Sequence, residues 1–542
     1  MNTKLYISLF AIGLLSTACV EDETNYDITP INEISIGGLE ENYYGMAYND
    51  VISIKPEITG SLTGDDLSNY EYTWYRCGGN HVHDTISHEK DLEWLAQASP
   101  GTHNLYLVVR DKTTGYEKNL STNLVLSSPF TRGFLILGNR PHSDNMIGLD
   151  MLTMIQGKND TIYAKDVFDN SETKIRNAKT MYLTGNSRSN RFYIQTEDGT
   201  YNPIFTNEQT LESIGEEFND LGLIECLEPH KTPIKLMGLA LQKGEGRYAA
   251  ALSQVPRFYL TEDQFFGHKG TEKMNQPINR YSNTSKIFFK FYPYIFYNTR
   301  RTISHAQTDY SSQYSPVILY DTDNDCFSYV IGTALGFTHM GQISNTVVLQ
   351  QLGIYLMNQP NGRTLVYGEN DHRLSSGRCN FIMKDNDDKY CLYRFELGFP
   401  SMGWNPQPSI RNPYFCNLDV ASMTGFLDRE QIFFASGANS IIYYSVGNTL
   451  YAYDYVAKRL ESKQFDGNIT YLAPDFASPR ENNLTNDATN YWVATFDGDK
   501  GHLYKMKTIE NADKIEFTHL DGQDWEIDLE IKSVLWKDGA IY

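Results

Sequence analysis

The amino-acid sequence predicts an all-β protein: a small N-terminal β-sandwich followed by a C-terminal β-propeller of seven or eight blades. Three observations support this fold class. Short strands bounded by turn residues recur along most of the chain, strand pairs return at intervals of tens of residues, and no helical pattern of comparable strength is present. The strand pattern therefore sets the domain organisation, and it is taken in chain order.

Residues 1–18 have the pattern of an export signal. Lys4 supplies the positive start, and residues 5–15 form an apolar core too short to span a bilayer, which takes about 20 residues. Small residues directly before Cys19 resemble the lipobox of bacterial lipoproteins, in which the cysteine is acylated and becomes the mature N-terminus. Ser16 departs from that pattern, which usually has leucine there. We expect lipidation at Cys19; an ordinary cleaved signal is the alternative.

Residues 19–30 form a polar tether that ends at Pro30. Its acidic residues 21–23 resemble the surface-export signal of lipoproteins in certain Gram-negative bacteria, which implies display on the outer face of the outer membrane. An acidic cluster that only keeps the tether solvated is the alternative. No later apolar run is long enough for a transmembrane helix, so the acyl chain is the expected attachment to outer-membrane lipid.

Composition limits the partners of the chain. Of the 542 residues, 41% are hydrophobic and 13% aromatic, which is a globular mixture, and the formal net charge is −21. Nucleic acid and anionic lipid bind clustered Lys and Arg, so this charge argues against both as partners. The cysteines after Cys19 have no CxxC or zinc-type spacing. Pairing among Cys379, Cys391 and Cys416 and free buried thiols are both compatible with this pattern.

Residues 31–128 have the short strands and turn signals of a small sandwich. Alternation predicts strands over 51–54, 70–75, 102–110 and 116–126, the second with Trp74 in its middle. The sequences YTWY at 72–75, DLEW at 91–94 and PGTHNLYLVVRD at 100–111 resemble strands of a PKD-like (polycystic-kidney-disease-like) module of the immunoglobulin type. Specifically, they are similar to PKD-like lipoproteins of outer-membrane nutrient-uptake loci.

Residues 129–542 are predicted to form the propeller, because strand pairs recur along them. The predicted pairs are 180–184 with 191–195, 235–241 with 247–252, 317–320 with 327–330, 381–384 with 390–395, and 491–496 with 502–506. At about 40 to 50 residues per blade, the region is long enough for seven or eight blades. We expect residues 530–536 to pair with the strand that begins at Phe134, which would close the ring.

The clearest meander lies at residues 440–465. Gly447-Asn448 joins two strands in a predicted type II′ turn, so Val446 lies opposite Thr449. This register places Ile442, Tyr444, Val446, Thr449, Tyr451 and Tyr453 on one face and Ile441, Tyr443, Ser445, Leu450, Ala452 and Asp454 on the other. Both faces are largely apolar, which favours a sheet covered on both sides.

Two clusters contain residue types that bind metals. His81, His83 and His88 lie close together in a predicted loop of the sandwich, but no HExxH or related zinc signature accompanies them. The sequence DTDND at 321–325 has the alternating carboxylates of calcium loops without the rest of an EF-hand. Asp and Asn also favour hairpin turns, so we favour a turn there and expect no cofactor.

Two aromatic loops are candidate binding surfaces. The proline-rich loop that contains Phe399 and Trp404 and continues to Tyr414 carries a tryptophan where little strand pattern would bury it. These rings could stack on sugars or clamp a peptide. For Trp404, burial in the core is the equal alternative. For residues 291–297, a place in the core of a blade is favoured.

No pattern of catalytic residues is evident. The chain has no GxSxG elbow, no phosphate loop with lysine and no complete dinucleotide fingerprint. The PKD-like resemblance implies a non-catalytic accessory of a TonB-dependent uptake complex, working with the transporter and its substrate-binding lipoprotein to capture glycans or peptides. A hydrolase or lyase acting on the same ligands is one alternative, and an adhesin or assembly scaffold is another.

Overall fold

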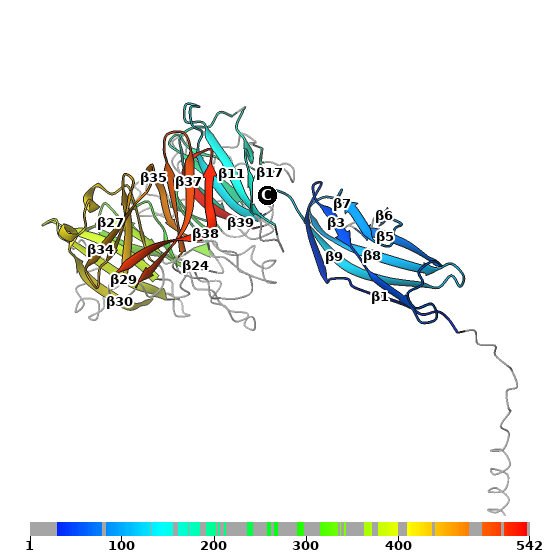
Figure 1. The fold of residues 1–542 in the computed structure, drawn as a ribbon. Helices are drawn as coiled ribbons and strands as arrows, with labels where there is room; N and C mark the ends of the chain where they lie inside the picture. Colours follow the sequence, from blue (N-terminus) through cyan, green and yellow to red (C-terminus); the bar gives the residue numbers. More distant parts are fainter. Residues whose placement is uncertain are drawn as a thin grey trace, which may run out of the picture. The chain divides into compact units, whose positions relative to one another are not determined.

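Figure 1 shows the computed structural model of the chain, which divides into two compact units, Met1–Leu126 and Ser127–Tyr542. The structure describes residues 30–77, 83–130, 132–155, 161–171, 173–184, 191–201, 204–205, 211–212, 236–241, 257–261, 265–268, 290–297, 315–333, 336–337, 341–342, 362–370, 378–398, 409–435, 440–475, 490–510 and 514–538. Within these residues the fold is all-β, and the helical elements are two 3-10 turns, η4 (Val420–Ser422) and η5 (Phe426–Asp428).

The first unit is a β-sandwich. One layer is a five-stranded sheet with the strand order β2-β9-β8-β5-β6, and two smaller sheets, β1-β4 and β3-β7, share its core. The strands are β1 (Ile34–Gly37), β2 (Asn42–Met46), β3 (Val51–Ile54), β4 (Glu57–Gly60), β5 (Tyr70–Cys77), β6 (His83–Ser87), β7 (Leu92–Leu95), β8 (Gly101–Asp111) and β9 (Glu117–Ser127). They include the four strands predicted from sequence alternation.

Alternation along β8 separates the two faces of the five-stranded sheet. Leu105, Leu107 and Val109 are fully buried, whereas Tyr106 and Val108 between them are only partly covered. Trp74 on β5 is also fully buried, and its indole N–H donates to the backbone oxygen of Lys90 at 3.2 Å. The inward side chains thus form the core, and the sheet keeps an outward face.

The second unit is a β-propeller. Its described residues include seven sheets built from antiparallel neighbours. The first three sheets along the chain are β10 (Arg132–Asn139), β11 (Ile147–Met154) and β12 (Thr161–Ala164) with β39 (Glu530–Asp538); β14 (Ala178–Thr184), β15 (Arg191–Thr196) and β16 (Thr200–Tyr201); and β19 (Leu236–Leu241), β20 (Arg257–Thr261) and β21 (Phe265–His268). The fourth and fifth sheets are β22 (Phe296–Tyr297), β23 (Ser315–Asp321), β24 (Cys326–Thr333), β25 (Gly336–Phe337) and β26 (Gly341–Gln342); and β27 (Arg363–Asn370), β28 (Arg378–Asp385), β29 (Tyr390–Gly398) and β30 (Ser409–Leu418). The last two sheets are β31 (Gln431–Phe434), β32 (Ile441–Val446), β33 (Thr449–Asp454) and β34 (Arg459–Gln464); and β35 (Asn468–Pro474), β36 (Asn490–Phe496), β37 (Gly501–Glu510) and β38 (Ile515–Ile527). A further small sheet joins β13 (Phe168–Asp169), β18 (Leu211–Glu212) and β17 (Ile204–Phe205).

The ring closes by pairing its two ends. β39 pairs antiparallel with β10, so that Phe134 lies opposite Trp536 and Leu135 opposite Leu535. In Figure 1 the red strand β39 accordingly lies in one sheet with the cyan strand β11. Edge strands of neighbouring sheets also contact each other, β31 with β35, β35 with β39, and β39 with β14, as strands around a propeller axis do. The predicted pairing of residues 530–536 with the strand that begins at Phe134 is confirmed.

The meander at 440–465 forms β32, β33 and β34 in the predicted register. Gly447 has a φ of 55° and Asn448 a negative φ, the pattern of a type II′ turn, and Val446 lies opposite Thr449. Both faces are covered. Tyr443 packs in a cluster with the next sheet, which includes β36, whereas Tyr444 packs in a cluster with the preceding sheet, which includes β28.

A recurring aspartate turn connects strands in several blades. At Asp321, Asp385, Asp454 and Asp497, a side-chain oxygen accepts two backbone N–H groups of the following loop at 2.8–3.1 Å. The carboxylate stabilises the turn by satisfying N–H groups that the strands cannot pair. This turn is the repeated feature of the propeller where strict sequence repeats are absent.

One predicted strand pair stays a prediction, because residues 247–252, the expected partner of residues 235–241, lie outside the described residues. Within the described residues β19 pairs with β20, with Leu239 opposite Tyr259. The sequence RFYLT of β20 is rich in aromatic and β-branched residues, which favour a strand. The other four predicted pairs are present.

Candidate functional site

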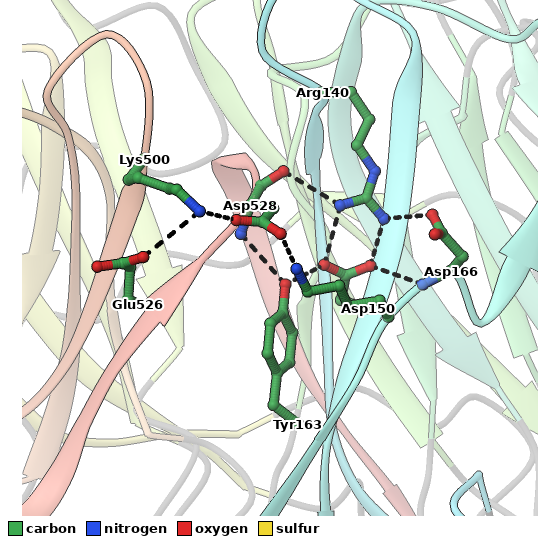
Figure 2. A network of polar contacts seen from close by, with 8 residues as sticks. Arg140, Asp150, Tyr163, Asp166, Lys500, Glu526 and Asp528 are labelled. Carbon is green, nitrogen blue, oxygen red and sulfur yellow. Dashed lines mark hydrogen bonds and ion pairs between the residues drawn. The ribbon is translucent and has the colours of Figure 1, made fainter.

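A network of polar contacts in the propeller centres on a buried ion pair between Arg140 and Asp150 (Figure 2). Arg140 follows β10, and Asp150 lies on β11 with a side chain that is 0% exposed. The guanidinium contacts both carboxylate oxygens, at 2.5 and 3.1 Å. The Tyr163 hydroxyl donates to Asp150 at 2.5 Å, and the backbone N–H of Asp166 donates to it at 3.0 Å. The buried charge of Asp150 is thus fully surrounded by donors.

Asp528 connects this pair to the end of the chain. Its backbone oxygen accepts from Arg140 at 3.1 Å, and its N–H donates to the Tyr163 hydroxyl at 3.1 Å. Its carboxylate pairs with Lys165 and with Lys500. Hydrogen bonds from these two ammonium groups lower the pKa of Asp528 from 3.8 to about 2. Because Asp528 joins β38 to β39, the cluster fastens the closing strand to the first sheet.

The chemistry of this cluster is that of a structural contact between the two ends of the propeller. We call the cluster of Arg140, Asp150, Tyr163 and Asp528 the clasp. Burial and the neighbouring Asp150 raise the pKa of Tyr163, so this hydroxyl stays protonated and donates. Asp528 stays ionised between its two lysines. Each of these groups is held in one charge state near neutral pH, whereas proton transfer works best with a pKa close to the working pH. The sequence analysis did not find this cluster, although the predicted pairing of Phe134 with residues 530–536 would have brought its two halves together.

The aromatic loop predicted to bind ligand is described only at its end. Phe399 and Trp404 lie outside the described residues, whereas Tyr414 is on β30. The Arg394 guanidinium lies 4.6 Å from the Tyr414 ring centroid, and the Tyr455 ring lies 6.2 Å away. Burial raises the pKa of Tyr414 to about 12. Tyr414 thus packs between blades, partly covered, and a ligand role for this loop stays a prediction.

Two of the three histidines of the predicted cluster lie at opposite ends of one strand, β6. His81 lies outside the described residues, while His83 begins β6 and His88 follows its end. The His83 Nδ1 lies 3.1 Å from the Cys77 sulfur, and the His88 Nδ1 lies 3.3 Å from the backbone oxygen of Tyr72. Within the described part of the chain, no three His, Cys, Asp or Glu side chains come together as a metal site.

The other sequence candidates have structural roles in the described residues. Asp321 is buried and holds the turn of DTDND, and the Asp325 carboxylate accepts from the Tyr320 hydroxyl at 3.0 Å. Cys391 and Cys416 are free thiols, and the buried Cys379 sulfur accepts from the Asn370 side-chain amide at 3.3 Å. In the second aromatic loop, Phe296 is fully buried, which confirms its predicted place in the core.

The family comparison agrees with the sandwich. Residues 19–174 match the PKD-like family. The matched range includes the sandwich and the first strands of the propeller. The PKD-like match confirms the resemblance found in the strands at 72–75, 91–94 and 100–111. No curated protein matches the chain. Among the described residues, no helix has the length and hydropathy needed to cross a membrane.

Several solved structures are similar to most of the chain at low identity. A quinoprotein alcohol dehydrogenase-like protein from Bacteroides thetaiotaomicron is 11% identical, with 91% of this chain and 96% of that chain covered and a TM-score of 0.31. The extracellular domain of a putative one component system from the same organism is 11% identical, with 90% and 66% covered and a TM-score of 0.31. The WD40 domain of SCAP from fission yeast is 9% identical, with 66% and 74% covered and a TM-score of 0.28. The propeller assignment rests on the strand pairing and not on these scores.

Proposed function

We propose that this chain is a non-catalytic lipoprotein of the cell surface, an accessory ligand-binding component of a TonB-dependent outer-membrane uptake system for glycans or peptides. The observation that carries the proposal is the start of the PKD-like match at Cys19, the residue that the sequence pattern marks for acylation. This start supports removal of residues 1–18 and a lipid on Cys19. The acidic residues that follow support display on the outer face of the outer membrane.

The architecture supports a binding role for the propeller. Pairing of β10 with β39 and the clasp around Asp150 fix the ends of the ring, so loops between strands are presented from a rigid support. An acyl anchor would keep these loops near the transporter, where a tether raises the effective concentration of a captured ligand, to about the millimolar range for a short linker. The aromatic loop with Phe399 and Trp404 is the proposed contact.

Cell fractionation tests the anchor. The Cys19→Ala variant is expected to leave the membrane fraction, because the acyl chain is the proposed attachment. Cys77→Ala, which removes a cysteine of the sandwich, is the matched control and should stay with membranes. A Cys19→Ala form that still sediments with membranes would contradict the anchor, and protease treatment of intact cells that leaves the chain whole would contradict surface display.

An array of glycans and peptides, probed with the full chain in detergent micelles, tests the ligand class. Trp404→Ala and Phe399→Ala are expected to weaken binding to the array hits about tenfold, the loss of roughly one aromatic contact of 1.4 kcal/mol. Leu427→Ala removes a side chain of the propeller that is 65% exposed and should change nothing. Undiminished affinity in Trp404→Ala would show that the loop is not the ligand site.

Turnover of a hit would favour a hydrolase or lyase, and co-purification of a transporter without ligand binding would favour a scaffold.

A further inference from the structure

The outward face of the five-stranded sheet carries a row of stacked rings. The register aligns Thr85, Tyr75, Tyr106 and Ser121 across β6, β5, β8 and β9, and aligns His83, Cys77, Asn104 and Asn123 in the next outward row. These side chains alternate with the buried Trp74 and Leu107, so they lie on the side of the sheet away from the core. The two rows are neighbours on one open surface.

Among the residues that the structure describes, the stack leaves one ring face without an aromatic partner. The rings of Tyr75 and Tyr106 are parallel to within 8°, with centroids 4.9 Å apart, and the His83 ring lies 5.4 Å from Tyr75. Tyr75 is therefore contacted by rings from β6 and β8. Within the described residues, Tyr106 contacts no ring but Tyr75, and the next residue in its row is the small, exposed Ser121. The stack thus ends in a ring with space beside it above β9.

Amide side chains border this space. Asn104 is exposed and lies directly opposite Asn123 in the next row. The Asn123 amide donates to the side-chain oxygen of Asn42 at 3.2 Å, which orients it on the same surface. An amide presents both donors and an acceptor, so this row can pair with groups that both donate and accept.

The surface is neutral although the chain carries a net charge of −21. Neither row contains Asp, Glu, Lys or Arg. On this outward face of β8 and β9, the nearest row with such charges is that of Arg110 and Glu117, which pair with each other at 3.7 Å between Nε and Oε1. A charged ligand would find no counter-ion in the two rows. An extended peptide would use the free backbone groups of a sheet edge, which this face does not offer.

We propose that this face of the sandwich binds a neutral sugar ring of a glycan. The C–H face of the sugar stacks on the open face of Tyr106 above Ser121, because C–H groups are attracted to the negative face of an aromatic ring. The hydroxyls, each a donor and an acceptor, bond to the amides of Asn104 and Asn123. This site is separate from the aromatic loop of the propeller and goes beyond the function proposed for that loop.

Affinity electrophoresis of the full chain in detergent, through gels that contain neutral β-glucan, α-glucan, mannan or xylan, tests the site. At least one of these is expected to retard the chain. Tyr106→Ala removes the stacking surface, and Ser121→Tyr fills the space beside it. Each should weaken binding about tenfold or more, which corresponds to about 1.4 kcal/mol. Tyr48→Ala removes a tyrosine that is 54% exposed elsewhere on the sandwich and should bind like the parent chain.

Tyr106→Phe keeps the stack and is expected to retain most of the affinity, which separates stacking from loss of the fold. Gels with acidic polygalacturonate should retard the chain less than the neutral polymers. Four results overturn the site: no retardation by any neutral polysaccharide, equal losses in Tyr106→Ala and Tyr48→Ala, unchanged binding in Ser121→Tyr, or binding lost in Trp404→Ala but kept in Tyr106→Ala. The last result would leave the propeller loop as the ligand site.

Discussion

The five-stranded sheet of the sandwich and the sheet β31–β34 of the propeller bury their residues in different ways. Along β8, buried and accessible side chains alternate, so that Leu107 is covered and Val108 is not fully covered. Along β32, five consecutive residues are buried, because a neighbouring sheet packs on each face. The five-stranded sheet of the sandwich therefore has a partly accessible face, whereas the sheet β31–β34 is covered on both faces.

Neighbouring substitutions give the sharpest test of this difference. In β32, Tyr443→Ala and Tyr444→Ala should both destabilise the propeller by about 3–5 kcal/mol, since each leaves a cavity in a different cluster. In β8, Leu107→Ala should cost about 2–5 kcal/mol, and Val108→Ala only about 0.5 kcal/mol. Urea unfolding of the four variants measures these values. Equal costs at Leu107 and Val108 would mean that the outward face is covered.

Substitutions in the clasp test whether closure of the ring stabilises the propeller. In its described residues, the sandwich has no comparable closure. Asp150→Asn leaves Arg140 without its buried partner and is expected to cost about 3 kcal/mol. Asp166→Asn is the matched control, because this carboxylate also contacts Arg140, at 2.6 Å, but is 74% exposed. Its loss should cost below about 1 kcal/mol. Similar unfolding midpoints for the two variants would argue against a role in closure.

Acid should weaken the clasp through Asp528. The folded-state pKa of about 2 lies below the ordinary value of 3.8, so the stabilisation is complete above the ordinary value and is lost as pH falls through about 2. Its size is about 1 kcal/mol for a partly exposed group. Asp528→Asn should therefore lower stability at pH 7 and flatten its decline between about pH 4 and pH 2. Glu526→Gln, which removes the more exposed partner of Lys500, should retain the decline of the parent chain in urea midpoints measured across this range.

The smallest difference between the two units is expected at a pair of matched glycines, one in each unit. Gly447 and Gly64 have φ values of 55° and 58°, and an added Cβ would meet no atom closer than 3.9 Å at either. Alanine should cost about 1 kcal/mol at both, because the penalty comes from the backbone alone. Urea midpoints that fall much further for Gly447→Ala would show that the hairpin register of the propeller depends on this turn.

Local sequence patterns predicted much of the fold. Gly447-Asn448 set the register of β32 and β33 because the turn type and the period of two leave one pairing. The apolar segments around Phe134 and Trp536 predicted closure because each needed a partner strand. The pairing of β19 with β20 was not predicted, because several strand-like segments follow β19 and sequence alone does not choose among them.

The polar features were harder to predict. Arg140, Asp150 and Asp528 have no periodicity, and their contacts depend on a strand pairing between opposite ends of the propeller. Tyr414 was assigned to a loop because prolines precede it, yet β30 continues through Pro413 and packs the ring against Arg394. The row of Tyr75 and Tyr106 was missed for the same kind of reason, because its rings come together only through the register of β5 with β8.

The pairing of β10 with β39 has a consequence for biosynthesis. The Asn139 side chain bonds to Glu530, which lies 391 residues later in the chain. At about 5–20 residues per second, the ribosome needs roughly 20–80 seconds to make the intervening chain, and during this time β10 has a free edge. Long-range pairing of this kind also folds slowly. The propeller therefore acquires the pairing of its two ends only when the last strand, β39, has been made.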